Sequence, residues 1–196
     1  MGAAADPIGS ARPARETLPS DMLSEWTSSK HTRSGAEICI RPLRPDDRVR
    51  EIQFVNSLSE RTRYLRLMTP IRFLSSQLLD QFMDIDYDQR MAFVATTMRD
   101  GIEAFVGVVR YGRTDQPDTA ELGITVTDGW QRDGVGRLLI DVLSRFARHQ
   151  GFKHFIGIVL PENHRMLAFA NRLGFDAKYN RDDHLVHISY DLATTG

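Results

Sequence analysis

The sequence predicts an α+β domain, and three observations lead to that prediction. Apolar residues make up 41% of the 196 residues and charged residues 26%, which is the balance of a soluble globular protein with a sizeable core. Segments in which apolar and polar residues alternate are mixed with segments in which apolar residues recur every three or four positions. No internal repeat is visible, and the length suits one domain better than two.

Charge and cysteine content exclude several classes of protein. The 25 basic residues face 26 acidic ones, for a formal net charge of -1, whereas a dedicated nucleic-acid binder needs a basic surplus or stripe. No apolar run approaches a membrane span of about 18 residues, and the N-terminus lacks the apolar core of a signal peptide. Cys39 is the only cysteine, which excludes an internal disulfide and a cysteine-rich metal site. We therefore expect a cytoplasmic protein with no nucleic-acid or membrane partner.

The first 36 residues differ from the rest of the chain. Residues 1–36 carry Ala, Pro, Ser, Thr and Arg without a helical or strand period, and Trp26 stands there as an isolated apolar anchor. Such a segment cannot bury enough surface to offset its ordering entropy, so we predict a disordered tail in which a short helix near Ser20–Trp26 can form. One domain is expected over residues 37–192, followed by a C-terminal end at 193–196.

The first half of the domain is predicted from local patterns. Alternation indicates the strands, Pro45 and the acidic residues after it open a helix, Pro70 interrupts the next helical region, and Gly101 lies in a hairpin turn. The expected elements are a strand at 37–41, a helix from 45 to about 57, two helical pieces within 58–82, and strands at 91–98 and 102–112.

The second half contains the clearest helix. Its apolar stripe includes Leu139, Leu143 and Phe146 at helical spacing, and Gly151 occupies the usual stop position. Asn163 is a suitable N-cap for the helix that follows the next strand. The expected elements are a strand at 119–127, a helix ending at about 149, a strand at 155–160, a helix from 163 to before 174, and strands at 175–180 and 184–192.

The most informative segment is the loop at 131–137, between a predicted strand and a predicted helix. Gly134 and Gly136 let the backbone approach a ligand closely, and the first helical turn leaves N–H groups without internal partners. Together these features can cradle a pyrophosphate, whereas a tight turn with close helix–sheet packing explains the same spacing. The loop lacks the Gly-Lys-Ser/Thr end of a P-loop and the third glycine of a dinucleotide-binding fingerprint.

The pattern Gln131-x-x-Gly134-x-Gly136 resembles the acetyl-CoA loop of the GNAT acetyltransferase superfamily. The strand Ala120–Val126 precedes it, and Asn163 is followed by Leu173-Gly174-Phe175, with the glycine eleven residues on, in the family's order. The resemblance covers residues 37–192 and implies an α+β, GNAT-type mixed, mostly antiparallel central sheet flanked by helices.

Three further segments are similar to the acetyltransferase domain of bacterial protein-lysine acetyltransferases: Ile40–Asp47, Leu58–Arg66 and Ile85–Asp88. In that branch the domain is often fused to an acyl-CoA-synthetase-like region or a cyclic-nucleotide-binding domain. We expect neither module here, because the 36 residues before the domain cannot hold one. The resemblance implies a protein lysine as the leading acceptor.

The resemblance also implies site residues. Glu121 matches the general base of this branch, and the alternative is a solvated or ion-paired strand glutamate. In the family, this strand splays from its neighbour and pairs with the pantetheine arm of the cofactor. Asn163 would touch that arm, cap its helix, or both, and Arg132 and Arg137 would contact phosphates or be solvated. The expected cofactor-binding residues are Ile124, Thr125, Val126, Gln131, Arg132, Asp133, Gly134, Val135, Gly136, Arg137 and Asn163.

Other polar residues are weaker candidates. Many family members carry a tyrosine seven residues after the asparagine, where this chain has Ala170, so the usual general acid is absent and Tyr179 or a water would have to replace it. Cys39 is expected to be a structural thiol rather than a nucleophile. His184 and His187 would point to opposite faces of a strand, so no metal is predicted.

Each of two clusters of charged residues can be interpreted either as a binding surface or as an ordinary solvated surface. The acidic group could attract a cationic amine, and the arginine run could contact an acidic protein surface, but each could equally be a solvated surface. The acidic group is Asp80, Asp84, Asp86 and Asp88, and the arginine run is Arg61, Arg63 and Arg66.

The sequence therefore predicts an acetyl-CoA-dependent N-acetyltransferase that transfers the acetyl group directly to an amine in a ternary complex, with Glu121 as the base. A small amine or amino acid is the alternative acceptor. The alternative of another class is a non-catalytic acyl-CoA-binding regulatory module. The absence of the usual tyrosine at Ala170 favours this alternative, whereas the presence of the matched base Glu121 argues against it.

Overall fold

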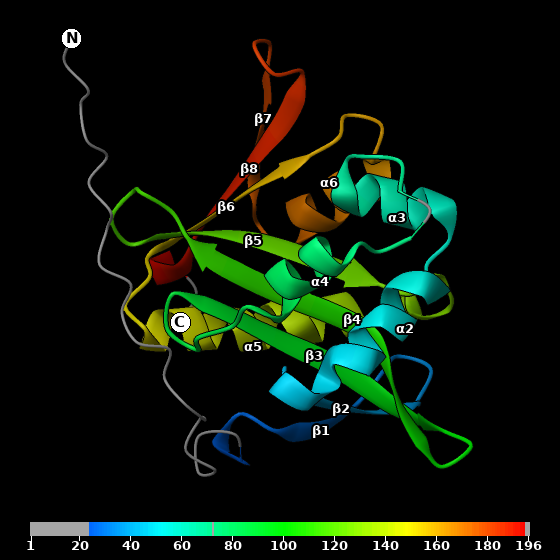
Figure 1. The fold of residues 1–196 in the computed structure, drawn as a ribbon. Helices are drawn as coiled ribbons and strands as arrows, with labels where there is room; N and C mark the ends of the chain where they lie inside the picture. Colours follow the sequence, from blue (N-terminus) through cyan, green and yellow to red (C-terminus); the bar gives the residue numbers. More distant parts are fainter. Residues whose placement is uncertain (1–23, 72, 195–196) are drawn as a thin grey trace, which may run out of the picture.

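The domain is built around one mixed sheet (Figure 1). The computed structural model describes residues 24–71 and 73–194. The strand order is β1-β2-β3-β4-β5-β6-β8-β7. All neighbouring strands pair antiparallel except β5 and β6, which are parallel, so the sheet is mostly antiparallel as predicted. The strands are β1 (Ser28–His31), β2 (Glu37–Pro42), β3 (Arg90–Arg99), β4 (Ile102–Arg113), β5 (Thr119–Val126), β6 (His154–Val159), β7 (Asp176–Asn180) and β8 (Leu185–Asp191).

Helices cover both faces of the sheet (Figure 1). One face carries α5, which contacts β3, β4 and β5, and the other carries α2, α3 and α4. No helix within residues 24–71 and 73–194 is long and apolar enough to cross a membrane. The helices are η1 (Pro45–Asp47), α2 (Arg48–Ser57), α3 (Glu60–Leu67), α4 (Ser76–Met83), η2 (Asp128–Trp130), α5 (Val135–His149), α6 (His164–Arg172) and η3 (Leu192–Thr194).

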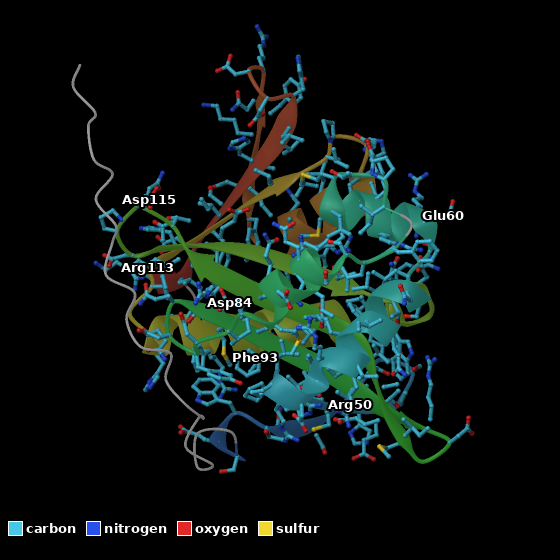
Figure 2. All side chains as sticks on the ribbon, viewed as in Figure 1. Arg50, Glu60, Asp84, Phe93, Arg113 and Asp115 are labelled. Atoms are coloured by element: carbon cyan, nitrogen blue, oxygen red, sulfur yellow. The ribbon has the colours of Figure 1, made fainter. Side chains whose placement is uncertain are left out.

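The central strands are buried on both faces, so the core has two parts. On β3, Phe93 belongs to the cluster beneath α5, whereas Ala92 and Val94 belong to the cluster beneath α2. Phe93 is fully buried and lies within the body of the domain in Figure 2. Burial on both faces explains why β3 is an almost continuous apolar run, as is usual for a strand covered by helices on each side.

Residues 24–36 belong to the fold, so the predicted tail boundary at 36 is wrong for this stretch. Strand β1 pairs with β2, and the Trp26 ring packs edge-on against Phe146, with 5.1 Å between the centroids. The sequence Ser-Ser-Lys-His of β1 is polar, because an edge strand is held by its backbone hydrogen bonds. Of the short helix predicted near Ser20–Trp26, only the end falls within the described residues, where Ser24 and Glu25 are helical and Trp26 lies in a turn.

Candidate active site

The parallel strands β5 and β6 separate part-way along their length. Their pairing covers only Thr119–Glu121 against His154–Ile156, although β5 continues to Val126 and β6 to Val159. Glu121 is thus the last residue of β5 that pairs with β6. Beyond it, the edge of β5 that faces β6 has no strand partner within the described residues, which leaves backbone groups for a bound chain.

Strand geometry determines which backbone groups face this open edge. The Thr127 N–H donates to the Val106 carbonyl across β4 at 2.9 Å. Because successive backbone N–H groups point to alternate edges of a strand, Thr125 also faces β4, whereas Ile124 and Val126 face the open edge. Of the three β5 residues that were predicted to bind the cofactor, only Ile124 and Val126 can therefore offer a backbone N–H group to a ligand between the strands.

The glycine loop follows the open end of β5 and leads into α5. Gly134 is the N-cap of this helix with φ of 95°, a conformation that favours glycine, and no side chain caps the helix. The first intrahelical bond runs from the Leu138 N–H to the Gly134 carbonyl, so the N–H groups of the first turn are available to an anion. Val135 itself is fully buried, and it can contribute only its backbone.

Gln131 and Asp133 hold the loop in place through protein contacts. The Gln131 amide donates to the Val126 carbonyl at 3.1 Å, which ties the loop to the open edge. The Asp133 carboxylate accepts from the Ser34 N–H at 2.7 Å and the Ser34 hydroxyl at 2.6 Å, and the Arg33 N–H donates to the Asp133 carbonyl. The hydrogen bonds from Ser34 lower the pKa of Asp133. The turn between β1 and β2 thus supports the loop. The prediction of a disordered tail over residues 1–36 did not include this contact.

The remaining predicted loop residues divide into packing and exposed positions. A Cβ on Gly136 would lie 3.1 Å from the Phe169 ring, so this glycine permits close packing of α5 on α6. Arg132 and Arg137 are exposed beside the helix N-terminus, where they can reach a phosphate, and the Arg137 Nε lies 3.8 Å from the Asp141 carboxylate. Close packing, one of the two explanations of the loop, therefore accounts for Gly136, and Gly134 supplies the backbone conformation at the start of α5.

Asn163 adopts the helix-capping role. Its side-chain oxygen accepts from the Met166 N–H at 3.2 Å at the start of α6. Ala170, at the position where the resemblance led us to look for a tyrosine, is buried in α6. Tyr179 lies on β7, three strands away from β5, and its hydroxyl is bonded to His184 at 3.1 Å. Tyr179 is therefore not placed to protonate a group between β5 and β6.

A groove of about 480 Å³ runs beside Glu121 on the face of the sheet that carries α2, α3 and α4. Glu121 is exposed in this groove, and Arg66 reaches it from α3. The Arg66 guanidinium lies on Gly123, where any Cβ would overlap it. Burial, together with the positive charge of Arg110, lowers the pKa of Arg66 to about 10, while Glu51 and Glu121 oppose that shift. Arg66 remains charged at neutral pH.

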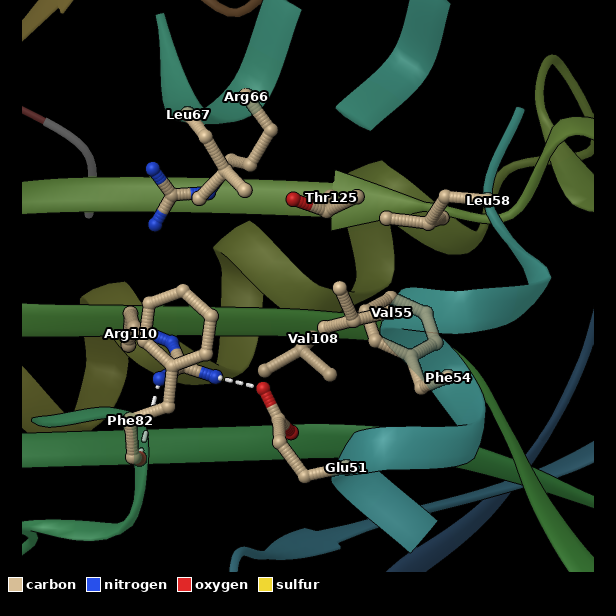
Figure 3. Close-up of a pocket in the computed structure, with 10 residues that line it drawn as sticks. All are labelled: Glu51, Phe54, Val55, Leu58, Arg66, Leu67, Phe82, Val108, Arg110 and Thr125. Atoms are coloured by element: carbon tan, nitrogen blue, oxygen red, sulfur yellow. Dashed lines mark hydrogen bonds and ion pairs between the residues drawn. The ribbon is translucent and has the colours of Figure 1, made fainter. Parts of the chain in front are cut away.

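Below the groove lies a small enclosed pocket (Figure 3). Buried Glu51 accepts from Arg110 at 2.7 Å, and Arg110 also donates to the Phe82 carbonyl at 3.0 Å while its guanidinium lies 4.4 Å from the Phe82 ring centroid. These contacts fix Arg110 in one orientation. The Thr125 side chain lines this pocket and is buried, so neither its backbone nor its side chain faces the predicted cofactor position.

The acidic group proposed to attract an amine is largely paired. Asp80 binds Arg48 at 2.6 Å, whereas Asp84 and Asp86 bind Arg90 at 3.1 and 3.2 Å. Only Asp84 lines the groove. The group therefore acts mainly as a set of structural ion pairs.

The arginine run does not form a common surface. Arg61 is exposed, Arg63 is buried and donates to the Leu58 carbonyl, and Arg66 points into the groove. Cys39 lies on β2, three strands from β5, and burial raises the pKa of its thiol, so it is a poor nucleophile. Within the described part of the chain, no group of three or more His, Cys, Asp or Glu side chains is placed to hold a metal ion.

Comparison with known proteins decides the family. The family model for the acetyltransferase (GNAT) domain matches residues 37–176, which include Glu121, the glycine loop and Asn163. The chain belongs to the GNAT acetyltransferase family. A relative in Pseudomonas aeruginosa, Acetyltransferase PA5475, is 40% identical over 149 residues, covering 76% of this chain and 80% of that protein.

Two further similar proteins are longer than this chain, and a third comparison is with a single GNAT domain. Acetyltransferase Pat of Mycolicibacterium smegmatis is 29% identical over 152 residues, which is 77% of this chain but only 44% of that protein. The crystal structure of the GNAT domain of S. lividans PAT superposes with a TM-score of 0.79 at 27% identity, covering 89% of this chain and 99% of that domain. A cAMP-binding acyltransferase from Mycobacterium smegmatis shares the fold, with a TM-score of 0.58 and 23% identity, and this chain covers 49% of it.

Proposed function

We propose that this GNAT protein is an acetyl-CoA-dependent N-acetyltransferase that acts on a primary amine with Glu121 as the general base. The position of Glu121 carries the proposal: it is the last residue of β5 paired with β6, and its side chain lines the groove beside the open strand edge. A carboxylate at this point lies between a donor bound along the edge and an acceptor bound in the groove. Acetyl-CoA is the donor expected of the family.

The chemistry requires a base. An amine with a pKa of about 10.4 is only ~0.1% neutral near pH 7.4, which is a deficit of roughly 4 kcal/mol in the availability of the nucleophile. A carboxylate within reach, directly or through one water, removes that proton. The amine nitrogen then attacks the thioester carbonyl carbon, the C–N bond forms, and the C–S bond breaks as the electron pair leaves on sulfur.

The donor side of the site is provided mainly by backbone groups. The N–H groups of Ile124 and Val126 face the open edge, where they can pair with the pantetheine arm or stabilise the thioester oxyanion. The uncapped first turn of α5 and the nearby Arg132 and Arg137 offer positive potential to the pyrophosphate. In this proposal, Gln131 and Asp133 position the loop rather than contact the donor.

The leaving group needs no dedicated acid. A thiol with a pKa of about 8.5 departs tolerably well as a thiolate, which water then protonates. This route is consistent with Ala170 at the usual tyrosine position and with Tyr179 being held by His184 on β7. Direct transfer is favoured over an acetyl-cysteine intermediate, because Cys39 lies three strands from β5.

A protein lysine is the proposed acceptor. Its support is the similarity of three segments to protein-lysine acetyltransferases, together with the likeness to Pat and to the PAT GNAT domain. A non-catalytic module remains the second candidate, since Ala170 removes the usual acid.

An acceptor panel tests these alternatives. The purified protein is incubated with acetyl-CoA and, separately, with lysine-containing proteins, free amino acids and polyamines, while thiol release and acetylated products are measured. We expect thiol release matched by acetyl-lysine on protein. Fast turnover of free amines with no acetylated protein would replace the lysine proposal by a small-amine one. Binding of acetyl-CoA without thiol release in any reaction would establish the binding-module alternative.

A further inference from the structure

The groove contains two groups of opposite charge, Arg66 and Glu121, for which the described residues provide no hydrogen bond or ion pair, although Glu51 and Glu121 lie near enough to favour the charged form of Arg66. Arg90 pairs with Asp84 at 3.1 Å, and Arg110 is bonded to the buried carboxylate below the groove. Among the described residues, no hydrogen bond or ion pair joins Arg66 or Glu121 to another side chain. The groove therefore offers one carboxylate and one guanidinium to whatever binds there.

Arg66 is held in place although it lacks a direct partner. Figure 3 shows its side chain descending from α3 onto β5, and the guanidinium rests on Gly123, two residues after Glu121 and on the same face of the strand. Gly123 pairs with Arg110 in the sheet register, so a second cation lies alongside. A half-buried guanidinium beside another positive charge is poorly solvated, and binding of an anion would relieve this.

Resting on the function proposed above, we propose that Arg66 binds a carboxylate of the acceptor, so that the preferred acceptor is an amine that also carries a carboxylate. Guanidinium and carboxylate match in a bidentate geometry, which orients as well as attracts. The amine would then lie toward Glu121 and the carboxylate toward Arg66. The carboxylate could belong to a free amino acid or to an acidic residue next to a lysine in a peptide.

Paired acceptors that differ only in the carboxylate test this inference. One pair is Nα-acetyl-lysine and its amide, and the other is a peptide with Glu or Gln beside its lysine. We expect the wild-type protein to prefer the carboxylate member of at least one pair by about 10- to 100-fold in kcat/KM, the range of hydrogen bonds to charged groups. A preference in only one pair identifies the source of the carboxylate.

Variants separate the role of Arg66 from general damage. Arg66→Gln should reduce the preference to about twofold or less, through a higher KM for the acceptor and an unchanged KM for acetyl-CoA. Gly123→Ala, which displaces the guanidinium without removing it, should have the same effect. Arg61→Gln, at an exposed position of the same helix, should keep the wild-type preference.

The outcomes that overturn this inference differ from those that overturn the proposed function. Equal rates for both members of each pair, with acetyl transfer intact, would remove the role of Arg66 and leave the acetyltransferase standing. If Arg66→Gln changed the KM for acetyl-CoA and left the KM for the acceptor unaltered, Arg66 would be assigned to acetyl-CoA binding and the inference would be overturned. Absence of transfer to every amine by the wild-type protein would instead overturn the proposed function.

Discussion

Replacing Glu121 with Gln is expected to lower kcat by about 10²- to 10⁴-fold, the usual contribution of a general base. The dissociation constant of acetyl-CoA, measured by calorimetry, should stay unchanged, because the donor contacts are assigned to Ile124, Val126 and the glycine loop. The amide retains the size of the side chain but cannot accept the proton from the amine. Thiol release at saturating donor and acceptor measures the loss.

The pH dependence of the variant provides a second measurement. Without a base, the reaction depends on amine that is already neutral in solution, and that fraction rises about tenfold per pH unit below the amine pKa of about 10.4. The rate of Glu121→Gln should therefore rise steeply between about pH 7 and 9 and approach the wild-type rate. Glu37→Gln, on an exposed position of β2, is the matched control and should behave as wild type. A wild-type rate for Glu121→Gln at neutral pH would refute the assignment of the base.

Replacing Asp47 with Asn is expected to lower the free energy of unfolding by about 3–5 kcal/mol, the cost of breaking a buried ion pair by removing one partner. Asp47 is fully buried and binds Arg41, also buried, through two bonds of 2.6 and 2.8 Å. It also accepts the Arg44 N–H at 2.8 Å and the Arg50 guanidinium at 3.1 Å. An amide removes the negative charge and leaves the Arg41 guanidinium supported mainly by Glu103.

Denaturant unfolding measures this loss. The midpoint should fall while the slope with denaturant concentration stays the same, since the surface exposed on unfolding does not change. Asp46→Asn, at the exposed neighbouring position, is the control and should change stability by less than about 0.5 kcal/mol. A loss for Asp47→Asn no larger than that of the control would show that Arg41 is adequately solvated or paired without it.

Most helices and strands could be predicted from the sequence because their patterns are local. The strand before the glycine loop, α5 and the Asn163 cap are specified by apolar spacing and capping residues within each segment. Strand β1 could not be predicted in this way. Its four residues are polar, and it is held by backbone pairing with β2 and by the anchoring of Trp26 on Phe146. Both contacts are tertiary.

The sequence could indicate those candidate site residues that belong to a recognisable motif. Glu121 and the loop glycines follow from the resemblance, whereas the functions of their neighbours depend on contacts between distant segments. Which strand residues face the open edge depends on the register of β5 against β4, and this excludes Thr125. That Arg66 reaches Gly123, while Arg63 three residues earlier is buried, depends on how α3 packs on the sheet.

The fate of the acetyl group in a single turnover tests the proposed chemistry most directly. The protein, in excess over acetyl-CoA labelled in the acetyl carbonyl, is mixed with a lysine acceptor, quenched at intervals and separated into protein, thioester and acceptor. If Glu121 activates the amine for direct attack, label passes from the thioester to the acceptor nitrogen at the rate of thiol release, with none bound covalently to the protein. Label that accumulates on the protein before it reaches the acceptor, or that stays on bound acetyl-CoA, would contradict direct transfer.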